Sequence, residues 1–281
     1  MFEPGVLFGL GSAVAWGSGD FAGGMAARRV GGMAVAGGAQ VAGFLLLVAA
    51  LVILRPAAPA GSTLLLGALG GIAGGIGLAA LYRGLALGAM GLVSAVSGIG
   101  GVLVPLAVSV LLWDTVLDPL QLAGIGCALA AVAAASGATS QGVNRQAVIM
   151  GLVAALGFGL WFVFLDRAAE HDQLWALVAS RGSASILVGG IALRRIDRAG
   201  MRAVAPLIAG AGVLDIAANA LVVLSFASIP VGISAALSCT YPLVTMILAR
   251  ALLREALPRL GLAAVALAVA GVVLIALGNY A

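Results

Sequence analysis

The stretch SIPVGISAALSCTYPLVTMILARALLREALP, residues 228–258, decides the fold. Between Val231 and Leu253 it is apolar apart from a few polar residues, and about 20 apolar residues suffice to cross a bilayer as one helix. Pro242 lies near the middle, where proline removes a backbone donor and leaves a carbonyl free. Membrane helices tolerate such breaks where a neighbouring helix or a cavity satisfies the backbone. We therefore predict a cavity-lining membrane helix over 231–252, with Pro242 as a structural hinge.

A weaker copy of this pattern occurs in the first half of the chain. The tripeptide VSA at 93–95 precedes ISA at 233–235 by 140 residues. The segments GLGSAVAWG at 9–17 and GLVAALGFG at 151–159 also match, at an offset of 142. These matches predict a tandem repeat with two domains, residues 1–140 and 146–281.

The composition excludes a soluble globular protein. The chain of 281 residues is 63% hydrophobic and only 9% charged, and a soluble core cannot hold that much apolar sequence. All 14 basic residues are arginines and they are scattered, whereas nucleic-acid binding needs basic residues gathered on one face. We therefore expect the lipid bilayer, and no nucleic acid, as the surroundings of this chain.

Apolar runs of about twenty residues predict ten transmembrane helices, five in each half. An odd number of crossings per repeat makes the second half enter the membrane from the opposite side, as in many secondary transporters. The predicted fold is therefore an all-α integral membrane protein with two inverted five-helix repeats. The expected helices cover residues 5–25, 33–54, 64–84, 91–112, 120–138, 147–166, 174–193, 206–226, 231–252 and 260–279.

The distribution of arginines predicts the orientation in the membrane. Eleven arginines fall in the loops after the odd-numbered helices, and two, Arg55 and Arg167, fall elsewhere outside the helices. Because cytoplasmic loops are enriched in basic residues, the odd loops are predicted to be cytoplasmic and both termini extracytoplasmic.

Ionisable side chains within a bilayer are costly, and each one is therefore a candidate functional group. Arg181 and Asn219 lie at about the same depth in antiparallel helices, and Asp215 shares a helix face with Asn219 four residues away. We predict that these three residues form a binding cluster near the membrane centre. The alternative is a buried structural ion pair of Arg181 and Asp215 that contacts no ligand. Gln40 is the repeat mate of Arg181, at an offset of 141.

Asp20 is predicted to lie about 7 Å from the membrane midplane, too far in depth to pair with Arg181. A gate or proton site is one interpretation of Asp20, and a solvated helix end is the other. Aromatic residues at mid-depth are not explained by the interfacial belt and could line a cavity, although core or lipid packing is the alternative for each. These aromatic residues are Trp16, Phe158, Trp161 and Tyr241. The glycines of the helix at 64–84 are interpreted as positions of close helix packing.

Catalytic signatures are missing from the sequence. It contains no HExxH motif, no GxSxG nucleophile elbow and no P-loop. We therefore expect neither an enzyme nor a bound metal or cofactor.

Three segments resemble the EamA-type members of the drug/metabolite transporter superfamily: AWGSGDFAGG at 15–24, ALYRGLALGAMGLVSAV at 80–96 and SAALSCTYPLVTMILARALLREALP at 234–258. The third is the most specific, and the first repeat has Gly101-Val102 where the second has Tyr241-Pro242. The resemblance implies a ten-helix carrier with a central cavity that moves amino acids, drugs, sugars or nucleotide sugars, often outward. It also implies cytoplasmic termini, contrary to the arginine count.

The predicted function is a secondary transporter that exports small metabolites, such as amino acids or drugs, across the cytoplasmic (inner) cell membrane by alternating access. Proton coupling and either a monomer or a homodimer are compatible with this prediction. The alternatives are a sugar or nucleotide-sugar carrier of the same fold and, from another class, a non-transporting membrane enzyme or scaffold subunit.

Overall fold

The computed structural model describes residues 4–113, 117–169, 172–193, 198–226, 228, 237–238 and 240–277, and its regular structure in these ranges is helical. The first half of the chain contains α1 (Pro4–Val30), α2 (Gly32–Leu54), α3 (Gly61–Ala86), α4 (Met90–Trp113) and α5 (Pro119–Gly137). The second contains α6 (Arg145–Ala169), α7 (Gln173–Ala184), α8 (Gly190–Leu193), α9 (Arg198–Phe226), α11 (Tyr241–Leu253) and α12 (Arg259–Leu277). A π-helical turn, Ser185–Gly189, joins α7 to α8 in one continuous segment.

Six helical segments among the described residues are long and apolar enough to cross a bilayer. They are Gly32–Leu54, Gly61–Ala86, Pro119–Gln141, Arg145–Leu165, Gln173–Leu193 and Gly200–Val222. Shorter apolar helices include Tyr241–Leu253 and Arg259–Ile275. The prediction of an all-helical, multi-pass chain is therefore confirmed, while ten membrane crossings stay a prediction.

Most helices begin and end within a few residues of the predicted positions, with two longer helices as exceptions. Helix α1 continues to Val30, beyond the expected end at residue 25, and α9 begins at Arg198 instead of residue 206. Both extensions carry arginines, Arg28 and Arg29 in α1 and Arg202 in α9. The prediction counted apolar residues only, so it ended each helix where the bilayer interior would end.

The position of Pro242 within a helix was predicted wrongly. Leu237 and Ser238 are helical, Thr240 forms a turn, and α11 begins at Tyr241, so that Pro242 lies in the first turn of a helix. Proline fits there because the first N–H groups of a helix have no acceptor within it. The rest of the expected span, residues 231–236 and 239, lies outside the described residues. A hinge at Pro242 stays a prediction.

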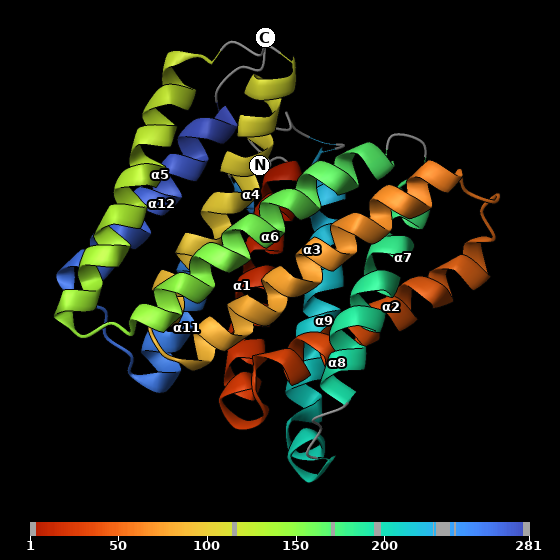
Figure 1. Cartoon of the computed structure of the whole chain (residues 1–281), viewed down its shortest axis with the longest axis horizontal. Coiled ribbons are helices and arrows are strands. Elements are labelled where there is room, and N and C mark those ends of the chain that lie inside the picture. Colours follow the sequence, from red (N-terminus) through yellow and green to blue (C-terminus); the bar gives the residue numbers. More distant parts are fainter. Residues whose placement is uncertain are drawn as a thin grey trace.

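The loops that follow α1, α3, α5 and α11 lie on the same face of the bundle, at the bottom in Figure 1. A cavity of about 390 Å³ on this face is lined by Arg28 in the last turn of α1 and by residues of the other three loops, including Gly88, Asn144 and Glu255. The beginning of α1 and the end of α12 lie toward the opposite face (Figure 1). The alternation of loops expected from the sequence is thus present for these four loops. The side of the membrane that this face meets stays a prediction.

Helix contacts recur between the two halves of the chain. Helix α3 packs against α6, and the corresponding helices of the other half, α9 and α1, pack against each other. In the same way, the contact of α4 with α6 corresponds to the contact of α11 with α1. The contact of α3 with α7 corresponds to the contact of α9 with α2. Helix α5 packs along α12, its own counterpart.

The recurrence extends to single residues at the α1–α11 and α4–α6 contacts. A methyl group added to Gly17 would lie 2.6 Å from Cβ of Val244, and one added to Gly159 would lie 2.4 Å from Cβ of Val104. Gly159 follows Gly17 by 142 residues and Val244 follows Val104 by 140 residues, the two offsets of the sequence repeat. Only glycine permits either approach, because both separations are far below carbon–carbon contact distance.

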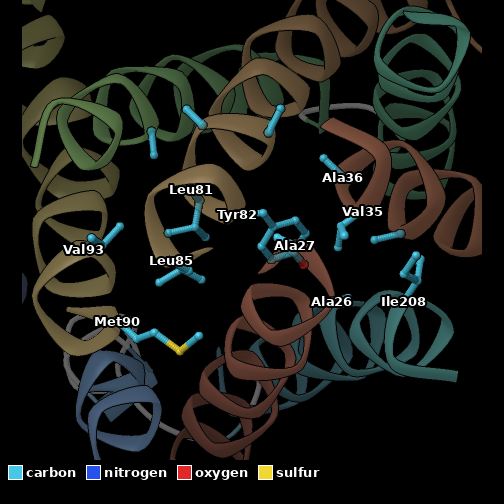
Figure 2. Packing of buried hydrophobic residues seen from close by; sticks show 14 of the residues in the cluster. Ala26, Ala27, Val35, Ala36, Leu81, Tyr82, Leu85, Met90, Val93 and Ile208 are labelled. Atoms are coloured by element: carbon cyan, nitrogen blue, oxygen red, sulfur yellow. The ribbon is translucent and has the colours of Figure 1, made fainter. Parts of the chain in front are cut away.

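Small and aliphatic side chains fill the interior between α1, α2, α3, α4 and α9. Figure 2 shows Leu81, Tyr82 and Leu85 of α3 between Val35 of α2 and Val93 of α4. A second buried cluster lies where α4, α5 and α12 meet and includes Leu92, Ala131 and Val265. The packing interpretation of the α3 glycines fits this arrangement, since Gly71 contacts the backbone of α7 and Gly74 lies under the Trp161 ring.

Candidate substrate and ion site

Arg181, in the last turn of α7, is the buried cation at the centre of the site. Its Nη1 donates a hydrogen bond to Oε1 of Gln40 on α2 at 2.8 Å, and its Nη2 donates to Oδ2 of Asp215 on α9. The ion pair joins two helices of the second half of the chain, and the bond to Gln40 adds a helix of the first half. The guanidinium therefore has both a counter-charge and a neutral acceptor in a place without bulk water.

Asp215 is the accessible member of this pair. Its side chain is 28% exposed, whereas that of Arg181 is 9% exposed. Nδ2 of Asn219, one turn further along α9, donates to the same Asp215 oxygen at 3.5 Å. The structure thus brings Arg181, Asp215 and Asn219 together as the depth argument predicts. Their role in binding stays a prediction.

Gln40 was not predicted as a site residue, although the sequence contained a signal for it. Gln40 and Arg181 are repeat mates, and in the structure they are hydrogen-bonded to each other. Equivalent residues of two repeats can meet only near the axis that relates the repeats. A polar residue at the repeat mate of an intramembrane charge is therefore a signal that could have found Gln40.

Asp20 lies in a separate group of oxygen atoms between α1, α4 and α11. Its Oδ2 accepts a hydrogen bond from Oγ of Ser94 at 3.2 Å. Oγ of Ser94 is 3.4 Å from Oγ1 of Thr245, which donates to the backbone oxygen of Gly17 at 3.1 Å. We call Asp20, Ser94, Thr245 and the Gly17 carbonyl the Asp20 group. Asp20 does not pair with Arg181, in agreement with the depth estimate.

Asp20 does not lie at a helix end, although its side chain is partly exposed. Helix α1 continues for ten residues after Asp20, to Val30, and Ser94 and Thr245 are fully buried beside it. Neither hydroxyl residue was predicted as part of the site. Serine and threonine are common in apolar helices, and their spacing in this sequence carries no signal of which carboxylate they meet.

The four predicted aromatic residues separate into two pairs. The rings of Trp16 and Tyr241 are in edge-to-face contact at 6.2 Å, and the Tyr241 hydroxyl donates to the backbone oxygen of Ser94 at 3.5 Å. These two residues border the Asp20 group. The second pair, Trp161 and Phe158, lies over the glycines of α3.

Trp161 also contacts the turn that carries the buried arginine. Its Nε1 donates to Oγ of Ser180 at 3.0 Å, one residue before Arg181. Phe158 packs beside Gly77, where its ring would lie 3.1 Å from an added methyl group, and it joins the buried core. Phe158 is therefore a packing residue in this structure, which is the alternative that the sequence left open for it.

Comparison with protein families matches residues 145–277 to the EamA-like transporter family. The match begins with α6 and ends with α12, so it covers the second half of the chain with Arg181, Asp215, Asn219 and Tyr241. A comparison with curated proteins found no match. The second half of the chain is thus similar to the EamA-like transporter family, and the apolar helices are those of a multi-pass membrane protein.

Proposed function

We propose that the chain is a secondary carrier of small metabolites that works by alternating access between two inverted five-helix repeats. The family match over the second repeat supports transport as the activity. The recurrence of helix contacts between the halves, down to Gly17 with Val244 and Gly159 with Val104, supports a two-fold relation of the repeats. Carriers of this kind bind substrates near the midplane, at the interface of the repeats.

Amino acids and related zwitterions are the proposed substrates. The observation that carries this proposal is a buried arginine paired with a carboxylate that is partly exposed. A guanidinium binds a carboxylate in a planar, two-pronged geometry, and a carboxylate binds an ammonium group. A zwitterion could therefore insert between Arg181 and Asp215 and replace their ion pair with two new ones. Each of the two side chains would then be paired with an oppositely charged group of the substrate, so the buried arginine would not be left unpaired.

Gln40 and Asn219 would hold the two charged groups during this exchange. Gln40 bonds Nη1 of Arg181, which leaves Nη2 for the substrate carboxylate. Asn219 bonds the Asp215 oxygen that faces Arg181. We further propose that Asp215 takes up a proton during the cycle, that transport is outward, and that the carrier resides in the cytoplasmic membrane.

Transport by the purified chain in liposomes tests this proposal. Arg181→Gln reproduces the residue found at its repeat mate, and Asp215→Asn keeps the size of the side chain, so the double variant leaves no unpaired charge. If the pair is structural, the double variant should fold and transport as the parent does. If the pair binds substrate, the double variant should melt at the parental temperature and transport amino acids at least about a hundredfold more slowly than the parent.

Asp215→Asn alone addresses the coupling. It should abolish any dependence of transport on a pH gradient, because the amide cannot take up the proton. The Ser12→Ala variant is the control, since Ser12 is also buried in a helix but hydrogen-bonds Ser238, away from the pair. A double variant that carries amino acids at the parental rate would contradict the assignment of the site and leave the carrier fold untouched.

A further inference from the structure

The Asp20 carboxylate has no cation beside it within the described part of the chain. The intramembrane arginine, Arg181, is committed to Asp215, and Arg28, further along α1, pairs with Glu255. A carboxylate without a partner is costly inside a bilayer, so such groups pair or mark an ion pathway. Asp20 must therefore either take up a proton or be compensated by another mobile cation.

The atoms around Asp20 are hard oxygen ligands. A carboxylate oxygen, two hydroxyl oxygens and a backbone carbonyl follow one another at separations of 3.2, 3.4 and 3.1 Å. Oxygens that hold a Ca²⁺ ion at about 2.4 Å lie about 3.4 Å apart when they are adjacent at right angles. Na⁺ has nearly the same radius. The spacing of the Asp20 group is therefore that of adjacent ligands around a cation of this size.

The proton of the Thr245 hydroxyl can be moved out of the way of a cation. Thr245 Oγ1 lies 3.4 Å from the backbone oxygen of Tyr241, one turn earlier on α11, which is a second acceptor for its proton. With that bond formed, the carbonyl of Gly17 no longer accepts from Thr245, and the lone pairs of Thr245 can face the ion. The group thus offers its ligands without loss of the threonine hydrogen bond.

We propose that the Asp20 group binds Na⁺. One carboxylate with neutral oxygens matches a single positive charge, whereas Ca²⁺ sites gather several carboxylates. The site would join α1 and α4 of the first repeat to α11 of the second, directly after the break at Thr240. Bound Na⁺ would therefore fix one arrangement of the halves, as coupling ions do at discontinuous helices of other carriers. The inference concerns binding, and it holds whether or not Arg181 and Asp215 bind the substrate.

Equilibrium binding of radioactive sodium to the purified full-length protein tests this site, with choline replacing sodium at constant ionic strength and fixed alkaline pH. The parent should bind Na⁺ saturably, Asp20→Asn should abolish binding, and Thr245→Val should weaken it about tenfold or more. Potassium, which is larger, should compete about tenfold less well than sodium. Quenching or enhancement of Trp16 fluorescence gives a second readout, because Trp16 lies one turn from Asp20 on α1.

Two controls separate this site from the substrate pair and from misfolding. Ser12→Ala removes a buried hydroxyl of α1 that is not part of the Asp20 group. The double variant of Arg181→Gln with Asp215→Asn removes the charges of the substrate pair. Both variants should bind sodium like the parent. Thermal melts verify folding, and Thr245→Val decides the question if Asp20→Asn does not fold. The proposal is overturned if the parent binds no sodium saturably, if binding survives both changes, or if Asp20 responds to pH alone, which would make the group a proton site.

Discussion

Gly71→Ala should destabilise the protein by forcing α3 away from α7. A methyl group at Gly71 would lie 1.9 Å from the backbone oxygen of Ser180 and 2.2 Å from Oγ of Ser183. Carbon and oxygen atoms need more than about 3 Å, so the two helices must separate by about 1 Å or more. The serine hydroxyl can rotate, but the backbone oxygen of a helix cannot.

The magnitude follows from two opposing terms. An alanine inside a helix is favoured over glycine by about 1 kcal/mol. Overpacking of a close contact costs about 1–3 kcal/mol, and more where backbone must move. The second term should win by about 1–2 kcal/mol, which lowers Tm by about 2–8 °C for a chain of this size. Ser180 precedes Arg181, so transport should fall as well.

Thermal melts in detergent, followed by tryptophan fluorescence, measure this change. Gly126→Ala is the matched control, because an added methyl group on α5 meets nothing within 4 Å. Helix propensity alone acts there, so this variant should melt at or slightly above the parental temperature. A Gly71→Ala protein that is as stable as Gly126→Ala would refute the argument that α3 and α7 are in backbone contact.

Three further predictions concern the loop face and the break before α11. Glu255→Ala should lower Tm more than Glu255→Gln. The carboxylate of Glu255 accepts a hydrogen bond of 2.8 Å from the Met90 N–H at the start of α4, and the amide of glutamine can still accept it, whereas the ion pair with Arg28 is partly exposed and contributes at most about 1 kcal/mol. Equal melting curves for the two variants would contradict this ranking. Pro242→Ala should leave Tm unchanged, because an N–H group in the first turn of a helix has no acceptor within that helix. The same variant should lower the rate of liposome transport at saturating substrate. Transport at the parental rate would show that the break is not a hinge. A reporter fused after Ala281 should be extracytoplasmic by the arginine count, and a cytoplasmic signal would favour the habit of the family.

The helix pattern was largely predictable because membrane helices obey a local rule. Each backbone polar group must be satisfied within its own segment, so length and hydropathy suffice to place the segments. The errors arose where that rule does not apply. The ends of α1 and α9 extend past the apolar runs, and the start of α11 depends on where proline can be accommodated.

The Arg181, Asp215 and Asn219 cluster was predictable for a related reason. Charges inside a bilayer are so rare that two of them at similar depth are expected to meet. The offset between the two halves also carried a signal for Gln40, which was not predicted as a site residue but contacts its repeat mate Arg181. Cost and symmetry are properties of the sequence itself, so they required no structure.

The surroundings of Asp20 were decided by tertiary structure alone. Ser94 and Thr245 come from helices that are far apart in the chain, and a hydroxyl inside an apolar helix can equally bond its own backbone. Which hydroxyl faces the carboxylate depends on how α1, α4 and α11 rotate against one another. That rotation is set by contacts such as Gly17 against Val244, where the absence of a side chain lets two backbones approach. The sequence by itself thus determined which segments form long apolar helices and which charges must be compensated, and the packing of small residues determined which oxygens surround Asp20.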